Sequence, residues 1–111
     1  MGYSRAVRIG NLVEVAGTTA QDGDIITGAD AYAQTKRILE KIGAALQEAG
    51  ASFEHVIRTR IYVTDITQWE AVGRAHGEAF GTIRPASTLV EVKALIAPRL
   101  LVEMEATAII S

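Results

Sequence analysis

The sequence predicts a single α+β domain in which two helices pack on one face of a mixed sheet. Residues 31–48 and 68–80 have apolar side chains at helical spacing, and the segments around them alternate apolar and polar residues as half-buried strands do. The 111 residues suffice for one hydrophobic core and include no linker, repeat or low-complexity segment. We therefore expect residues 1–111 to form one domain with the order ββ(β)-α-β-α-β-β.

A hairpin is expected at the start of the chain, over residues 6–16. Gly10 and Asn11 both tolerate the positive φ that a tight turn requires, so the turn is expected there. Gly17 is expected to end the second strand at a point where the backbone closely approaches another group. Residues 22–26 predict a further turn followed by a short edge strand.

A long helix is expected over residues 31–48. Asp30 is a preferred N-cap residue, because its carboxylate accepts hydrogen bonds from the free N–H groups of the first turn. Gly50 provides the left-handed conformation that commonly ends a helix. Lys36 and Lys41 are among the charged residues that mark the solvated side of this helix.

The next strand is expected over residues 56–64 and alternates between two faces. Strict alternation places Ile57 on the face that meets the helices and Val56 on the opposite face, beside Arg58 and Arg60.

A second helix is expected from Gln68 to about Phe80. Thr67 and Glu70 have the spacing of a capping box, which predicts this start. The buried side of the helix is expected to include Trp69.

Two glycines of this second helix, Gly73 and Gly77, are four residues apart. Glycine weakens a helix, so this spacing predicts close packing against a neighbouring element.

The last two strands, over residues 84–92 and 100–110, are expected to form a hairpin joined by a short loop. Such a pair would bring Glu91 near Glu103 or Glu105 on one face. This group of acidic side chains is the first candidate for chemistry.

The sheet face away from the helices combines charged and apolar side chains. The expected members are Arg58, Arg60, Glu91, Glu103 and Glu105, with Val56, Leu89, Leu101 and Ile109. One interpretation is a solvent-facing ladder of opposite charges, which stabilises little. We favour the second interpretation, in which sheets of several subunits meet, because one helix layer leaves much apolar sheet surface uncovered.

Composition excludes several classes of protein. The net charge of −2 and the lack of a basic stripe argue against a nucleic-acid surface, and the absence of cysteine excludes disulfides and thiolate chemistry. No apolar run approaches the ~20 residues of a membrane helix, so we expect a soluble, cytoplasmic protein. His55 and His76 have no partner at metal-ligand spacing, so we expect no metal site, and His76 is expected to pack or cap.

Four segments resemble the RidA (YjgF/YER057c/UK114) family of reactive-intermediate deaminases. Residues 2–7 with Gly-Asn at 10–11 resemble the family's opening Gly-Pro-Tyr-Ser-Gln-Ala and Gly-Asn, and residues 15–17 resemble its Ser-Gly strand end. Residues 56–65 resemble its Val-Lys-Thr-Thr-Val-Phe-Val-x-Asp. The sequences Pro-Ala-Ser-Thr and Val-Glu-Met-Glu-Ala near the C-terminus resemble its Pro-Ala-Arg-Ser and Ile-Glu-Ile-Glu-Ala.

The resemblance implies a chorismate-mutase-like fold and a homotrimer whose three sheets form an inner barrel, with ligand clefts between subunits. It also implies an activity: water attacks the imine tautomer of a small enamino acid and yields a 2-oxo acid and ammonia. This chemistry requires neither a metal nor a cofactor. The implied partners are a small metabolite and other copies of the chain, with no nucleic acid and no membrane.

The resemblance also implies roles for individual residues. Glu103 corresponds to the glutamate that positions water, and Tyr3 to the tyrosine that closes the pocket. Ser87 stands where the family has the arginine that grips the substrate carboxylate. A neutral hydroxyl lacks that charged fork, and losing a charge-assisted pair costs roughly 1.5–3 kcal/mol. Among alternative anion-binding residues, Arg84 is preferred over Arg60 and Arg5 because it borders the motif.

The candidate substrate-binding set is completed by three residues that flank these motifs, namely Gly17, Thr18 and Leu89. Three functions remain open: a hydrolytic deaminase of a small imine or enamine with altered anion recognition, a non-catalytic trimeric module that binds a small metabolite, and a ribonuclease or translation inhibitor. The net charge of −2 places the third behind the other two.

Overall fold

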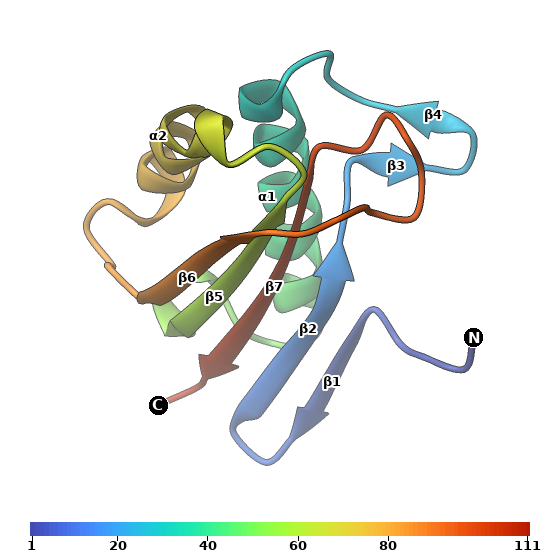
Figure 1. Cartoon of the computed structure of the whole chain (residues 1–111). Coiled ribbons are helices and arrows are strands. Elements are labelled where there is room, and N and C mark those ends of the chain that lie inside the picture. The colour runs from blue at the N-terminus through green and yellow to red at the C-terminus, as the bar shows by residue number, and fades with distance from the viewer.

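The computed structural model describes all 111 residues and shows two helices packed on one face of a five-stranded mixed sheet (Figure 1). The strands of this sheet are β1 (Ala6–Ile9), β2 (Leu12–Thr18), β5 (Val56–Val63), β6 (Ala86–Glu91) and β7 (Val102–Ile109). The helices are α1 (Ala31–Glu48) and α2 (Trp69–Phe80). The predicted α+β architecture is confirmed, and neither helix is long and apolar enough to cross a membrane.

The strand order is β1-β2-β7-β5-β6, so β7 is the central strand and pairs antiparallel with both β2 and β5. The predicted hairpin of the last two strands is wrong, because β6 pairs with β5, in parallel, and never meets β7. The connection over residues 92–101 is long enough to cross the end of β5. In Figure 1 it runs toward β3 (Gln21–Asp22) before turning back into β7.

This topology separates the acidic side chains that the hairpin would have united. Glu91 lies opposite Val63, whose side chain is buried under the helices, and its Oε1 accepts a hydrogen bond from the N–H of Ile66 at 2.9 Å. Glu103 and Glu105 lie on the face away from the helices, opposite Tyr62 and Arg60 of β5. The predicted contact of Glu91 with these two acids is therefore wrong.

The N-terminal hairpin is confirmed, with Gly10 at φ +58° in its turn. The strand β2 continues past Gly17 to Thr18, and its pairing with β7 shifts between Val15 and Thr18. The predicted edge strand forms as β4 (Ile25–Ile26), but it pairs with β3 in a separate two-stranded sheet.

The helix α1 begins and ends as predicted. The carboxylate of Asp30 accepts from the N–H of Ala33 at 2.8 Å, and Gly50 follows the helix at φ +85°. Its buried side packs on β2 and β7 and forms the centre of the core. The buried residues of α1 are Ala31, Gln34, Thr35, Ile38, Leu39, Ile42, Ala45 and Leu46.

The predicted alternation of β5 fails at its first two residues. Val56 is only 3% exposed whereas Ile57 is 48% exposed, the reverse of the prediction. A register shift against β7 between Val56 and Arg58 explains the reversal, because a bulge moves the following residues to the other face. From Thr59 onward the alternation is regular.

The start of α2 differs from the predicted capping box. A single 3-10 turn, Ile66–Gln68, precedes the helix, and Asp65 caps that turn by accepting from the N–H of Thr67 at 3.0 Å. Trp69 is 56% exposed rather than buried, because the 3-10 turn rotates the first residue of the helix away from the sheet. The buried residues of α2 are Val72, Ala75 and Phe80.

The two helical glycines do not mark a packed contact within the chain. A Cβ added at Gly73 or Gly77 would meet no atom within 4 Å. The predicted close packing of these glycines is therefore wrong for the chain by itself.

The face of the sheet away from the helices has no covering layer and is turned toward the viewer in Figure 1. The register places Val7, Ile9, Leu12, Glu14, Thr107 and Ile109 on this open face toward one end of the sheet. Its large apolar members are exposed by between 42% and 75%. Leu89 and Val56, which were expected on this face, instead pack toward the helices, because they share the side of the buried Ile61 and Ala108.

Candidate active site

A cavity of about 540 Å³ lies between the N-terminal segment, the end of β2 and the start of β7. It combines three of the predicted site residues, Tyr3, Gly17 and Glu103. The complete lining is Met1, Tyr3, Arg5, Ala16, Gly17, Thr19, Gln21, Gly23, Lys41, Ile96 and Glu103. Ile96 belongs to the connection between β6 and β7, so the crossing of that connection closes one side of the cavity.

The carboxylate of Glu103 lies directly over Gly17. A Cβ built on Gly17 would collide with Glu103 Oε2 and would lie 3.2 Å from its Cδ. The irregular pairing between Val15 and Thr18 brings this part of β2 toward Glu103. Gly17 was predicted to be a close-approach position, and the group it approaches is the candidate catalytic carboxylate.

The environment of Glu103 favours its protonated form. Burial raises the pKa of the Glu103 carboxyl, and the negative charge of Glu105 raises it further. The guanidinium of Arg5 acts in the opposite direction and lowers this pKa, but the net shift is upward. A carboxyl whose pKa is shifted toward neutrality is suited to exchange protons with a reacting group.

Arg5 is held at the wall of the cavity by three hydrogen bonds. Its Nη1 donates to the carbonyl of Gly17 at 3.0 Å and to Thr18 Oγ1 at 2.9 Å, and its Nη2 donates to the Tyr3 hydroxyl at 3.3 Å. Thr18 in turn donates to the carbonyl of Ala16 at 2.8 Å. Tyr3 and Thr18, both predicted site residues, thus meet at Arg5.

The remaining predicted residues lie elsewhere. Ser87 is opposite Thr59 and Leu89 is opposite Ile61, which places both on the helix side of the sheet, whereas Glu103 is on the open side. Arg84 precedes β6 at φ +57°, its side chain is exposed, and it does not line the cavity. Within one chain, Ser87, Leu89 and Arg84 are therefore separated from Glu103.

Ser87 ends a chain of three hydrogen-bonded side chains. Thr59 Oγ1 donates to Ser87 Oγ at 2.8 Å and lies 2.9 Å from His76 Nε2. Since the Thr59 proton is directed to Ser87, His76 Nε2 is the donor in the second bond. Burial lowers the pKa of His76, which favours its neutral form. His76 therefore packs and donates a structural hydrogen bond, in line with its expected role.

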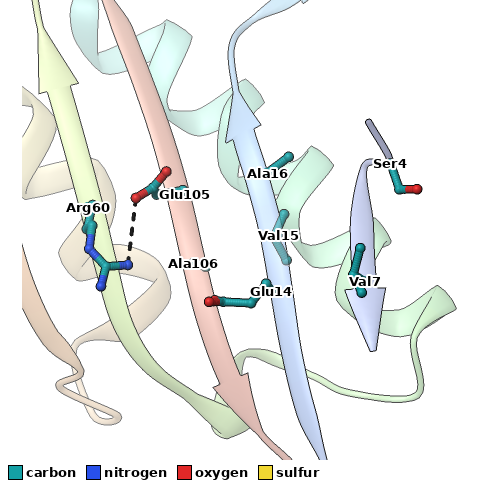
Figure 2. A pocket seen from close by; sticks show the side chains of 8 residues that line it. All are labelled: Ser4, Val7, Glu14, Val15, Ala16, Arg60, Glu105 and Ala106. Atoms are coloured by element: carbon teal, nitrogen blue, oxygen red, sulfur yellow. Dashed lines mark ion pairs between the residues drawn. The ribbon is translucent and has the colours of Figure 1, made fainter. Parts of the chain in front are cut away.

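A second, smaller cavity of about 250 Å³ lies on the same open face, and Figure 2 shows its lining. Arg60 of β5 reaches toward Glu105 of β7, with 3.6 Å between Nη1 and Oε1, and the Tyr62 hydroxyl donates to the same carboxylate at 3.1 Å. Glu14 accepts from the Thr107 hydroxyl. Because these charged groups already have partners inside the chain, this cavity offers a weaker ligand site than the one at Glu103.

Nowhere in the chain do three or more His, Cys, Asp or Glu side chains gather in an arrangement that could hold a metal ion. Lys41 is the second cation of the larger cavity. Its Nζ donates to the carbonyls of Thr19 and Gln21 at 2.7 and 3.0 Å and pairs with Asp22 at 3.2 Å. Lys41 therefore fixes the turn that forms one wall.

Sequence reasoning missed the central position of Arg5 and the place of Lys41 in the cavity. From the sequence, Arg84 was preferred to Arg5 as an anion-binding residue. Arg5 stands where the family's opening motif has glutamine, and this replacement of a neutral residue by a cation could have identified it. Lys41 was assigned to the solvated side of α1, and only the fold places its ammonium beside the carbonyls of Thr19 and Gln21 and the carboxylate of Asp22.

Comparisons with known proteins agree with this fold. The sequence model described as endoribonuclease L-PSP matches residues 1–110. The crystal structure of Rv2704 from Mycobacterium tuberculosis, a member of the YjgF/YER057c/UK114 family, is similar at 58% identity with a TM-score of 0.91 and covers 98% of this chain and 87% of that one. A putative endoribonuclease from Thermotoga maritima has a TM-score of 0.94 at 28% identity, covering 100% and 88% of the two chains.

Relatives among curated proteins also cover nearly the whole chain. An uncharacterized protein of Streptomyces coelicolor is 44% identical over 108 residues, which are 96% of this chain and 81% of the relative. The 3-aminoacrylate deaminase RutC of Acinetobacter baylyi is 33% identical over 108 residues, covering 96% and 85%.

Proposed function

Because the chain belongs to the endoribonuclease L-PSP family, which includes the YjgF/YER057c/UK114 proteins, we propose that it is a hydrolytic deaminase of a small imine or enamine metabolite. The observation behind this proposal is the half-buried carboxyl of Glu103, whose pKa is raised, at the wall of a cavity of about 540 Å³. A relative 33% identical to the chain is a 3-aminoacrylate deaminase, which supports the reaction type. We expect the protein to act in the cytoplasm.

The proposed reaction adds water across a C=N bond. Ionised Glu103 accepts a proton from a water molecule while the water oxygen attacks the imine carbon, and the π electrons move to nitrogen, which then takes that proton from Glu103. In the resulting carbinolamine the hydroxyl proton passes to nitrogen, the C–N bond breaks as the C=O bond forms, and the nitrogen leaves as ammonia. The products are an oxo compound and ammonia, and neither a metal nor a cofactor takes part in the proposed steps.

Other residues of the cavity have supporting roles in this proposal. Gly17 leaves room for the Glu103 carboxylate, and Thr18 helps to hold Arg5. Tyr3 is 60% exposed at the rim, where its ring closes the cavity over a bound metabolite. We assign Glu103 and Tyr3 to catalysis and Gly17 to substrate binding. Thr18, predicted as a substrate-binding residue, is fully buried, so we assign it to the positioning of Arg5.

We further propose that the protein is a homotrimer with its ligand clefts between subunits. Ser87 and Leu89 are on the other side of the sheet from Glu103, and Arg84 lies outside the cavity that Glu103 lines, so a cleft that includes all four requires two copies of the chain. The exposed apolar side chains of the open sheet face support an assembly, since a monomer would leave them in water.

A trimeric module that binds a metabolite without converting it is the second candidate. The neutral Ser87 side chain favours this candidate. Its oxygen accepts a hydrogen bond from Thr59, and the single O–H that it can donate binds a carboxylate less tightly than an arginine fork does. A ribonuclease is disfavoured by the net charge of −2, because RNA binding depends on neutralising phosphates.

The test is ammonia release from 2-aminoacrylate and 3-aminoacrylate generated in situ, comparing the wild type with Ser87→Arg. Deaminase function predicts release above the uncatalysed rate in the wild type for at least one substrate. Release of ammonia only by Ser87→Arg would show that the protein can activate water at Glu103 but that its natural substrate is neither of these two compounds. No release by either protein, together with a metabolite that raises the thermal midpoint, would favour the binding module.

A further inference from the structure

Arg5 differs from Lys41, the other cationic side chain of the cavity, in forming no ion pair with a carboxylate. Of the charged residues there, Lys41 pairs with Asp22, whereas Arg5 forms no ion pair with any carboxylate. Arg5 and Glu103 line the same cavity without forming such a pair. An unpaired cation beside a candidate catalytic group is a candidate ligand-binding group.

The guanidinium of Arg5 is held in place by hydrogen bonds but still has N–H donors without a partner. A guanidinium has five N–H donors, and the bonds to Gly17, Thr18 and Tyr3 use three of them. The Tyr3 ring also lies 5.7 Å from the Arg5 Cζ, close enough for a cation–π contact. Two donors therefore remain for a ligand, and the side chain needs little reordering to present them.

We propose that Arg5 binds the carboxylate of the substrate in place of a charged residue at position 87, and so selects acids over neutral compounds among small imines and enamines. The proposal rests on the deaminase function proposed above and adds the group that selects the substrate. Ser87 offers a hydroxyl but no charge, Arg84 lies outside the cavity, and Lys41 is paired with Asp22. Arg5 is therefore the cavity cation that is free to bind an anion, and its charge acts on Glu103.

This arrangement also links binding to proton transfer. The charge of Arg5 lowers the pKa of Glu103, against the effects of burial and of Glu105. A carboxylate bound to Arg5 offsets that positive charge, so the pKa of Glu103 rises further and the carboxylate becomes a stronger base. Glu103 would thus be strengthened as a base only when a substrate with the correct charge is present.

The test measures binding separately from turnover, by calorimetric titration with 2-oxobutanoate and its neutral counterpart 2-oxobutanamide. The proteins are the wild type, Arg5→Gln, Arg5→Lys and the control Arg99→Gln, which changes an exposed arginine outside the cavity. We expect Arg5→Gln to weaken 2-oxobutanoate binding about ten- to a hundredfold, while the amide is affected less than threefold. Arg5→Lys should retain part of the affinity, and Arg99→Gln all of it.

Three results would overturn the proposal: no binding of 2-oxobutanoate to the wild type, equal affinity in Arg5→Gln, or equal losses for the acid and the amide. A circular-dichroism melt of each variant confirms that the fold is intact. Failure of the deaminase function is recognised separately, as an absence of ammonia release from a protein that still binds the acid through Arg5.

Discussion

The carboxylate of Glu103 occupies the space that a side chain at residue 17 would need. Its Oε2 would collide with a Cβ added at Gly17, and its Cδ is 3.2 Å from the position of that Cβ. Two strands, β2 and β7, thus combine to place one acid at the wall of the cavity.

Replacing Gly17 with Ala should therefore damage the site more than the fold. The atom in the way is the end of a flexible side chain, so Glu103 can rotate aside, and we expect the free energy of unfolding to change by less than about 1 kcal/mol. The displaced carboxylate should lower deaminase turnover at least about tenfold, as misplacing a catalytic group does. Urea unfolding and ammonia release measure the two effects.

Gly73→Ala is the matched control, because a Cβ there meets no atom within 4 Å. It should stabilise α2 by about 0.5–1 kcal/mol and leave turnover unchanged. Full activity in Gly17→Ala would show that the position of Glu103 over Gly17 is not needed for catalysis.

The chain of hydrogen bonds from His76 through Thr59 to Ser87 predicts a stability effect. Thr59→Val preserves the shape of a fully buried residue but leaves the His76 N–H without its acceptor, which costs about 1–3 kcal/mol. Urea unfolding at pH 8, where His76 is neutral, measures the loss. The control is Thr82→Val on the exposed surface, and an equal effect in both variants would contradict the structural role of the chain.

The raised pKa of Glu103 predicts that its ionisation destabilises the fold. The carboxyl of Glu103 holds its proton more tightly in the folded protein than in the unfolded chain. Protonated Glu103 therefore contributes its full stabilisation at pH values below its pKa in the unfolded chain. This contribution is lost as the pH rises through its higher pKa in the folded protein. Glu103→Gln should therefore melt at a higher temperature than the wild type at pH 8. This difference should disappear below about pH 4, where the wild-type carboxyl is protonated in both states. A difference independent of pH would show that packing, and not charge, is responsible.

The exposed apolar side chains on the open sheet face predict that copies of the chain associate through these side chains. Leu12 lies between Ile9 and Ile109 in the sheet register, and all three are exposed in the isolated chain. The wild type should sediment at three times the 11.9 kDa of the chain, and Leu12→Glu should sediment as a smaller species. Ile25→Glu, which changes an exposed residue of the separate β3–β4 hairpin, should remain trimeric. A monomeric wild type would contradict the proposed clefts between subunits.

Much of the fold could be predicted from local patterns. The cap at Asp30, the stop at Gly50 and the turn at Gly10 each depend on a few neighbouring residues, and all three are confirmed. The predictions that failed depend on contacts distant in sequence. The parallel pairing of β6 with β5 and the bulge after Val56 leave no local signal, since alternation identifies a strand but not its neighbour.

The candidate site, too, was predicted where a local motif identifies a residue and was not predicted where its position depends on distant contacts. Motif resemblance predicted Tyr3, Gly17 and Glu103, and the structure brings these three to one cavity. The motif alone could not show that Ser87 lies on the other face, because that depends on which strand β6 joins. Nor could it show that Arg5 lacks an acidic partner, which is a property of the assembled fold.

The most direct test of the account compares ammonia release by the wild type, Glu103→Gln and Glu105→Gln. The substrate is 2-aminoacrylate or 3-aminoacrylate, whichever the wild type converts. Glu105 is the matched control, because it lies two residues along the same strand and face but pairs with Arg60 and Tyr62. We predict at least an approximately hundredfold loss of turnover in Glu103→Gln, typical for removal of a general base, and less than a tenfold loss in Glu105→Gln. Wild-type turnover in Glu103→Gln would contradict the central claim that Glu103 activates the attacking water.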